Sequence, residues 1–333
     1  MRYGVISGAT WGLDTVILAM AVALAPFVGA GQAPIASALI HDVISALFLV
    51  VYMGARGRLG HTLAAMRTRS GRVVVLAALL GGPVGMSGYL IAINNIGPSY
   101  TAIISTFYPA LGTLLAFLIL GERMRPRQIV ALLVALTAII AIGWSSSAES
   151  GDGNAIFGII AALACVFGWG SEAVILTWGM RDDSVDNETA LQIRQTTSGL
   201  TYLIVVAPIA GALGFSARAA LTPATGVIAL AAIAGTTSYL FYYKALGTIG
   251  ASRGMALNIS YSAWAVIFAL VLQGTIPTPL QVVCCVVILV GTVLAATAEW
   301  SDLRLTRRPA SAPASPAQTA PAGAATVSTE PLP

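Results

Sequence analysis

Apolar residues fill this chain in runs of about 20, the length that a helix needs to cross the hydrocarbon core of a bilayer. Short polar segments separate these runs. The pattern predicts an all-α integral membrane protein with ten transmembrane helices, nine being the alternative count. The runs lie near residues 3–25, 34–54, 73–93, 99–120, 128–145, 155–178, 189–210, 226–246, 253–273 and 279–298.

Composition supports a membrane protein. Hydrophobic residues make up 57% of the 333 residues and charged residues only 9%, against about 25% charged residues in a soluble domain. A water-soluble fold has no place for so much apolar surface. The first run resembles a signal peptide, with small residues at 23–25, but Asp14 interrupts it and Pro26 follows it. We therefore expect a retained transmembrane helix.

Positive charge is distributed unevenly between the polar segments. The segments after the second, fourth and tenth runs carry most of the arginines, whereas the opposite set of loops carries Glu149, Asp152 and Arg218. Because cytoplasmic loops are enriched in Lys and Arg, both termini are expected in the cytoplasm. The arginines on which this rests are Arg56, Arg58, Arg67, Arg69, Arg72, Arg123, Arg125, Arg127, Arg304, Arg307 and Arg308. Residues 309–333 are rich in Pro, Ala, Ser and Thr, which predicts a disordered cytoplasmic tail.

The chain contains an internal repeat. Residues 11–18 (WGLDTVIL) recur as residues 169–176 (WGSEAVIL), and the Ile-Gly pair at 96–97 recurs at 249–250. The matched segments keep their order, which divides the chain into a first repeat over residues 1–145 and a second over 155–300. Because each repeat holds five helices, an odd number, the second must enter the membrane from the opposite side. Inverted repeats are common in secondary transporters, with the solute site near the bilayer midplane between the repeats.

Helix-breaking residues fall within the third and fourth runs. Gly82, Pro83 and Pro109 are the candidate hinges, because a broken helix frees backbone groups that can line a cavity. Close helix packing by small residues is the alternative and accounts for most of the other glycines.

Several ionisable residues lie inside the predicted helices, where a charge costs about 2.5–3.5 kcal/mol and usually serves function. They are Asp14, His41, Asp42, Glu172, Arg194 and Lys244. Asp14 and Glu172 are equivalent in the repeat, as are the pairs 41–42 and 194–195. His41, Asp42, Asp14 and Arg194 are candidates for coupling transport to protons, since a histidine titrates near neutral pH. A structural ion pair between Glu172 and Arg194 is the alternative, and Lys244 is expected to reach the membrane surface.

Aromatic residues cluster in the same runs. Together with a nearby acid, Glu172, these rings resemble a cage for an organic cation, which is held by ring faces and a counter-charge. They are Trp11, Trp169, Tyr242, Tyr243, Tyr261 and Trp264. Asn258 and Ser260 are candidates to bind a hydroxyl group. The alternative for any single ring is ordinary packing.

Motifs of enzymes are missing from the sequence. It has no phosphate-binding loop and no nucleophile elbow. Two histidines and three cysteines show no spacing typical of a metal site or a disulfide framework. We therefore expect a protein that is not an enzyme and that needs no cofactor and no metal.

These motifs resemble those of a known family. Ten helices in two halves, with Gly121-Glu122 after the fourth helix, resemble the EamA-type drug/metabolite transporter superfamily. A set of segments over residues 3–298 looks like its LicB-type bacterial choline permease branch: His41-Asp42, Gly82-Pro83-Val84-Gly85-Met86, Tyr108-Pro109-Ala110, Trp169-Gly170-Ser171-Glu172, Ile193-Arg194-Gln195, Ser238-Tyr239-Leu240 with Tyr242-Tyr243, and Leu257-Asn258-Ile259-Ser260-Tyr261 with Trp264. Asp14 and Lys244 depart from that branch.

The resemblance implies a secondary transporter of the bacterial inner membrane that imports choline or a related quaternary amine by alternating access. Trp11, Trp169, Glu172, Tyr242, Tyr261 and Trp264 would then surround the solute. An exporter of amino acids, metabolites or drugs on the same fold is the alternative, and a membrane scaffold or lipid-handling enzyme is a more distant one. The expected partners are a small cationic solute and membrane lipid, without nucleic acid, for a monomer or homodimer.

Overall fold

The structure is a computed structural model that describes residues 1–145, 154–181 and 184–298, which form one compact unit. These residues contain helices and no strand. The predicted tail at 309–333 lies outside them. The first repeat contains α1 (Arg2–Val22), α2 (Ala33–Ala55), α3 (Leu59–Arg67), α4 (Arg69–Leu79), the π-helical turn η1 (Leu80–Met86), α5 (Ser87–Ser105), α6 (Tyr108–Leu115), η2 (Ala116–Leu120) and α7 (Pro126–Ser145).

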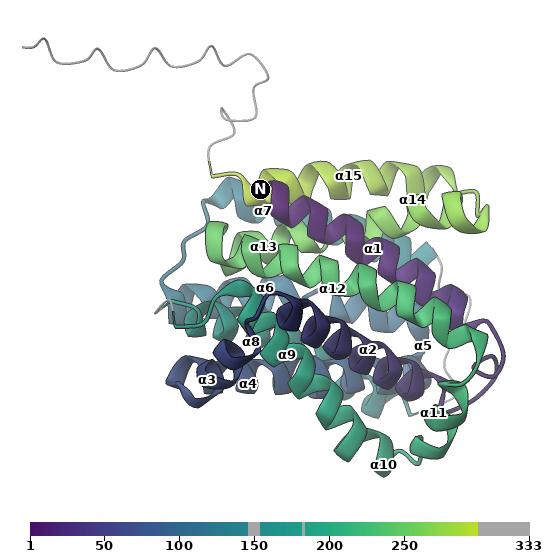
Figure 1. Ribbon diagram of the computed structural model, residues 1–333. Helices are drawn as coiled ribbons and strands as arrows, with labels where there is room; N and C mark the ends of the chain where they lie inside the picture. Colours follow the sequence, from purple (N-terminus) through teal and green to yellow (C-terminus); the bar gives the residue numbers. More distant parts are fainter. Residues whose placement is uncertain (146–153, 182–183, 299–333) are drawn as a thin grey trace, which may run out of the picture. The chain divides into compact units, whose positions relative to one another are not determined.

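The second repeat follows the same plan. It contains α8 (Ala155–Gly179), α9 (Asn187–Thr201), η3 (Tyr202–Val206), α10 (Ala207–Ile209), α11 (Leu213–Ala219), α12 (Pro223–Ile249), α13 (Ala251–Asn258), α14 (Tyr261–Gln273) and α15 (Pro279–Ala296) (Figure 1). The all-helical membrane fold predicted from the sequence is therefore confirmed. Two short helices, α3 and α11, lie between the predicted runs.

Nine helices among the described residues are long and apolar enough to cross a membrane. The seventh predicted run is the exception. It continues as helix over Asn187–Ile209 in the pieces α9, η3 and α10, but α9 carries many polar residues. Gln192, Arg194, Gln195 and Ser198 of α9 are all buried. These polar residues make the seventh run less apolar than the other nine. Because they are buried against other helices, they are not exposed to lipid.

The two repeats break their helices at equivalent glycines. Gly97 has φ +78° and ψ 163°, and Gly250 has φ +86° and ψ 165°. A side chain at such a backbone angle is strongly disfavoured, and glycine adopts it freely. Each break separates one transmembrane helix from the next without a loop, so α5 is two helices joined at Gly97, as α12 and α13 are joined at Gly250.

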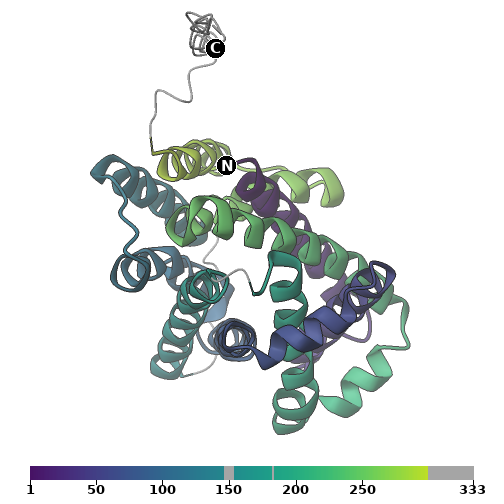
Figure 2. The ribbon, with the colours of Figure 1, turned by 60° about the vertical axis from the view of Figure 1, so that its left-hand side comes forward.

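The first helix of each repeat packs against the other repeat. Helix α1 contacts α12, α13 and α14, and its equivalent α8 contacts α4, η1, α5 and α6. Two further contacts between the repeats join equivalent helices, α2 with α9 and α7 with α15. Figures 1 and 2 both show the purple α1 against the green and yellow-green helices of the second repeat. Because α1 and α8 each pack into the opposite repeat, residues of both repeats meet in the middle of the protein.

Glycines at intervals of four allow α1 to approach its neighbours closely. A methyl group added at Gly4 would lie 2.5 Å from the Leu257 side chain, and one at Gly12 would lie 2.7 Å from Cβ of Trp264. Stripes of small residues are typical of helix interfaces in membranes, where close contact drives association. On the outer surface, large apolar side chains such as Val51 and Ile204 are exposed, as expected for a surface that faces lipid.

Candidate functional site

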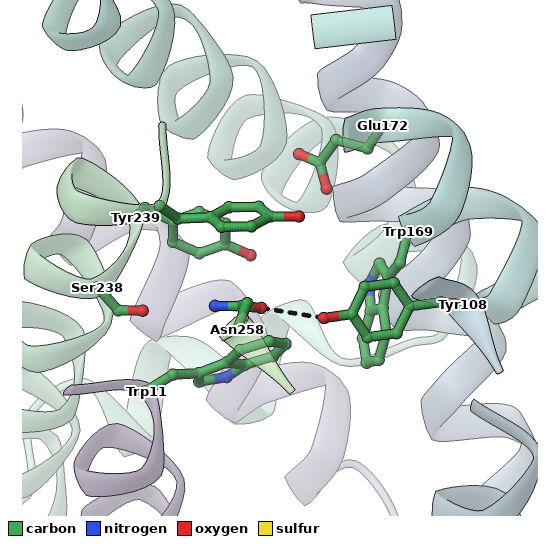
Figure 3. Close-up of a pocket in the computed structure, with 8 residues that line it drawn as sticks. Trp11, Tyr108, Trp169, Glu172, Ser238, Tyr239 and Asn258 are labelled. Carbon is green, nitrogen blue, oxygen red and sulfur yellow. Dashed lines mark hydrogen bonds between the residues drawn. The ribbon is translucent and has the colours of Figure 1, made fainter. Parts of the chain in front are cut away.

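A cavity lies where the exchanged helices α1 and α8 meet α6, α12 and α13. Its volume is about 30 Å³, well below the range of about 300–1,000 Å³ that is usual for small-molecule sites. Its lining is mostly aromatic, with one carboxylate and two small polar side chains (Figure 3). The lining residues are Trp11, Tyr108, Trp169, Glu172, Ser238, Tyr239, Tyr242 and Asn258.

Aromatic contacts hold the rings of the cavity in fixed orientations. The rings of Trp11 and Trp169 meet edge to face with centroids 6.1 Å apart, and Tyr108 meets Trp169 in the same way at 5.8 Å. Tyr261 stacks on Trp11 from behind, with centroids 4.3 Å apart. The Trp169 Nε1–H donates to the carbonyl oxygen of Gly81 at 3.1 Å. The cavity therefore has a rigid aromatic wall.

Hydrogen bonds fix the polar side of the cavity. Tyr108 Oη donates to Asn258 Oδ1 at 3.0 Å (Figure 3), and Asn258 Nδ2 donates to Ser7 Oγ at 2.9 Å. Ser238 Oγ donates to the carbonyl oxygen of Ser7 at 2.9 Å. This row joins α6, α13, α1 and α12, so the amide of Asn258 has one defined orientation towards the cavity.

Each repeat contains a buried contact between an acidic and a basic side chain of its first and second helices. In the first repeat, His41 Nε2 lies 3.2 Å from Asp14 Oδ1. In the second, Arg194 Nε donates to Glu172 Oε1 at 3.0 Å. The residues of the two pairs occupy equivalent positions in the repeat. The predicted alternative of a Glu172–Arg194 ion pair is therefore present in the structure, together with a matching pair that the sequence comparison did not specify.

Asp42 joins the two ion pairs across the repeat interface. Its Oδ1 lies 3.2 Å from His41 Nδ1, and its Oδ2 accepts a hydrogen bond from Ser198 Oγ at 2.6 Å and lies 3.9 Å from Arg194 Nη1. The result is a continuous row of ionisable groups from Asp14 to Glu172, of which Glu172 lines the cavity. The four coupling candidates His41, Asp42, Asp14 and Arg194 all belong to this row.

The structure brings most of the predicted binding residues together. Trp11, Trp169, Glu172, Tyr242 and Asn258 line the cavity. Tyr261 lines a second cavity of about 10 Å³ that shares Tyr108 and Trp169 with the first. Trp264 lines neither of these two, because its Cβ packs on Gly12 and its ring on Phe268, with centroids 6.4 Å apart. Ser260, whose hydroxyl donates to the Leu257 carbonyl oxygen at 2.6 Å, is also absent from both linings.

Three cavity residues were not predicted as binding residues: Tyr108, Ser238 and Tyr239. Each lies in a segment that carries the family resemblance, but the resemblance did not assign its side chain to the binding site. Tyr108 drew attention only through the hinge candidate that follows it. The spacing of Ser238, Tyr239 and Tyr242 along α12 is the signal that was available, since residues three and four apart lie on one face of a helix.

The hinge candidates lie in the π-helical turn η1 and at the start of α6. Pro83 lies inside η1, where its missing N–H disrupts the regular helical hydrogen bonds. A methyl group at Gly82 would lie 2.3 Å from Ser198 Oγ. Pro109 lies in the first turn of α6, directly after the cavity residue Tyr108.

Lys244 is half-buried, with Nζ 5.8 Å from the ring centroid of Tyr3 at the start of α1.

The described residues contain no group of three His, Cys, Asp or Glu side chains arranged to hold a metal ion. The three cysteines are buried and free. The chemistry of the site is therefore that of ring faces, one carboxylate and a few hydrogen-bonding groups.

A model of the EamA-like transporter family matches residues 2–144 and again residues 156–297. The chain belongs to the EamA-like transporter family. This finding confirms the family expected from the sequence and identifies a multi-pass membrane transporter.

Two further comparisons agree with this assignment. The protein LicB of Haemophilus influenzae is 32% identical over 197 residues, which span 57% of this chain and 63% of the relative, less than two thirds of its length. A solved crystal structure superposes with a TM-score of 0.64, covering 89% of this chain and 96% of the other at 21% identity. The latter similarity concerns the fold alone.

Proposed function

We propose that this transporter carries choline or a related quaternary ammonium solute across the membrane by alternating access. The observation that carries the proposal is the composition of the cavity, in which Glu172 is the carboxylate among five aromatic side chains. A quaternary ammonium group donates no hydrogen bond and is bound by ring faces and an opposite charge, each ring contributing about 0.5–2 kcal/mol. The resemblance to the choline permease branch points to the same solute.

The polar residues of the cavity suit the other end of such a solute. Asn258 and Ser238 lie on the side away from Glu172 in Figure 3, where they can bind a hydroxyl group. An amino acid would need a cationic partner for its carboxylate, and Arg194 is engaged with Glu172 behind the lining. This arrangement favours a cationic solute over the amino acids of the alternative exporter.

Direction and coupling are the finer parts of the proposal. We infer import across the bacterial inner membrane with both termini in the cytoplasm, in line with the distribution of arginines, by a monomer or homodimer. The charged row from Asp14 through His41 and Asp42 connects the cavity with a histidine. It is the proposed route by which proton binding is coupled to solute movement.

Transport assays on purified protein in proteoliposomes test the proposal. We expect uptake of labelled choline that is competed by excess choline and betaine, but not by a neutral isostere of choline in which carbon replaces the charged nitrogen. Labelled amino acids, loaded inside or outside the same vesicles, test the exporter. Transport of amino acids without transport or binding of any quaternary amine would show that the proposal is wrong.

A further inference from the structure

Arg194 lies between two acidic side chains, Glu172 of the cavity and Asp42 of α2. Its guanidinium donates from Nε to Glu172 Oε1 at 3.0 Å and from Nη2 to Tyr239 Oη at 3.0 Å, and its Cζ lies 4.4 Å from the centroid of the Tyr239 ring. Arg194 is only 3% exposed. These contacts, a carboxylate and an aromatic face, are the ones that the proposed solute would use. Arg194 is thus an internal cation in contact with the groups that would recognise a solute cation.

Charge balance sets a condition on solute binding. While Arg194 pairs with Glu172, the carboxylate is already neutralised and offers little attraction to a second cation. A solute ammonium in the cavity would also be repelled by the guanidinium, because both charges lie in a low dielectric where repulsion is strong. Binding therefore requires that Arg194 weaken its contact with Glu172.

Asp42 offers Arg194 a second partner within a short movement. Arg194 Nη1 lies 3.9 Å from Asp42 Oδ2, too far for a hydrogen bond but close enough that a small rotation of the side chain would make one. The same nitrogen now donates to Gln195 Oε1. Besides Arg194, Asp42 is approached by His41 and by the Ser198 hydroxyl.

We propose that Arg194 is a resident counter-ion that moves from Glu172 to Asp42 when the solute cation binds and returns when it leaves. This inference rests on the proposed function and concerns the mechanism of the same site. In the empty carrier, Arg194 neutralises Glu172. In the loaded carrier, the solute neutralises Glu172 and Arg194 neutralises Asp42. In both forms Glu172, the carboxylate of the cavity, then has a cationic partner, and this is the condition under which the carrier changes conformation within the membrane.

Two substitutions should change solute affinity in opposite directions. Arg194→Gln removes the competing cation and should tighten choline binding, whereas Asp42→Asn removes the second partner and should weaken it. We expect changes of about 5- to 50-fold in either direction, a usual size for coupling between two binding events. Arg72→Gln at an exposed arginine of α4 is the matched control and should bind choline like wild type. Calorimetric titration of choline into purified, monodisperse protein measures the affinities.

Transport by Arg194→Gln gives a second readout. The empty variant has an unpaired Glu172 and should not complete the return step, so net uptake of choline into empty vesicles should be lost. Exchange of external labelled choline against internal unlabelled choline needs only the loaded form and should persist. A purely structural role of Arg194 predicts equal loss of net uptake and exchange.

The outcomes separate the two proposals. If wild-type protein binds no quaternary amine, the proposed function is wrong and the role of Arg194 is wrong with it. If wild type binds and transports choline but Arg194→Gln binds it no more tightly, or loses exchange together with net uptake, only the resident counter-ion is wrong. Should Arg194→Gln fail to fold, Asp42→Asn decides, because unchanged choline affinity in that variant overturns the movement to Asp42.

Discussion

The indole rings of Trp11 and Trp169, equivalent residues of the two repeats, meet edge to face with centroids 6.1 Å apart at the wall of the cavity. They meet because α1 and α8 each pack into the opposite repeat. Equivalent residues of the two repeats therefore meet at the cavity.

The cavity is nevertheless asymmetric in charge. Glu172 lines it, while the equivalent Asp14 pairs with His41 and is absent from its lining. The predictions below use this difference, since each acid serves as a control for the other.

Removing the charge of Glu172 should weaken solute binding. Glu172→Gln keeps the size and hydrogen-bonding capacity of the side chain, and we expect choline affinity to fall by about one to two orders of magnitude, or about 1.5–3 kcal/mol. Asp14→Asn, the equivalent change outside the cavity lining, should have a smaller effect. Calorimetry on well-folded variants provides the measurement, and normal choline affinity in Glu172→Gln would exclude this carboxylate from the site.

The ring face of Trp11 should matter more than that of Trp264. Trp11→Leu should weaken choline binding by about 0.5–2 kcal/mol, and Trp11→Phe by less, since phenylalanine retains a weaker ring face. Trp264→Leu should leave affinity close to wild type, because Trp264 does not line the cavity. The same affinity loss in Trp11→Leu and Trp264→Leu would contradict the geometry of the site.

Gly81 should tolerate no side chain. A methyl group there would lie 1.7 Å from Glu172 Oε2, so Gly81→Ala must displace the carboxylate or the η1 turn. We expect lower thermal stability in detergent and weaker choline binding. Gly226→Ala in α12 is the control, because no atom lies within 4 Å of its added methyl group and alanine favours a helix by about 1 kcal/mol. Equal behaviour of the two variants would show that η1 does not constrain Glu172.

Replacing His41 should change the pH dependence of transport. Histidine is the side chain whose unperturbed pKa lies near neutral, and His41 contacts both Asp14 and Asp42. His41→Gln should flatten the dependence of the initial uptake rate on pH between about 5.5 and 8, while choline binding at equilibrium is retained. If the profile keeps its shape, proton coupling does not involve His41, and Asp14 becomes the candidate to test.

A charge cluster outside the membrane segments should make stability sensitive to acid. Arg58 pairs with Asp186 and Glu188, joining the segment after α2 to the start of α9. Burial raises the pKa of Asp186, but hydrogen bonds from the Thr189 backbone amide and from Arg58 outweigh it, so its pKa is lowered from the usual 3.8.

A lowered carboxyl pKa stabilises the fold above the pKa of the unfolded chain and loses that effect as the pH falls through the folded value. Asp186→Asn keeps the N-cap hydrogen bond, so the variant should lose only the contribution of the charge, at most about 1 kcal/mol for this half-exposed pair. Its melting temperature should lie below that of wild type at pH 7, with the gap narrowing below about pH 3.8. A gap that does not depend on pH would assign the effect to something other than the charge.

The sequence by itself determined the membrane fold and the repeat. Runs of about 20 apolar residues leave few alternatives to spanning helices, because every backbone group in lipid must be hydrogen-bonded within the protein. The equivalence of Trp11 with Trp169, and of Asp14 with Glu172, follows from the sequence. The recurrence of the Ile-Gly pair at 96–97 and 249–250 follows from the sequence too, whereas the structure showed that both glycines are breaks with the same unusual backbone conformation.

Only the tertiary structure decided which of these residues form the site. Tyr261 and Trp264 lie three positions apart on α14. Tyr261 nevertheless stacks on Trp11, whereas Trp264 packs on Gly12. Their different places depend on the path of α1 from the other repeat, which no local pattern encodes. The row of charges from Asp14 to Glu172 also requires α2 and α9 to lie side by side. The sequence supplied the charges, and the packing of helices distant in the chain determined their partners.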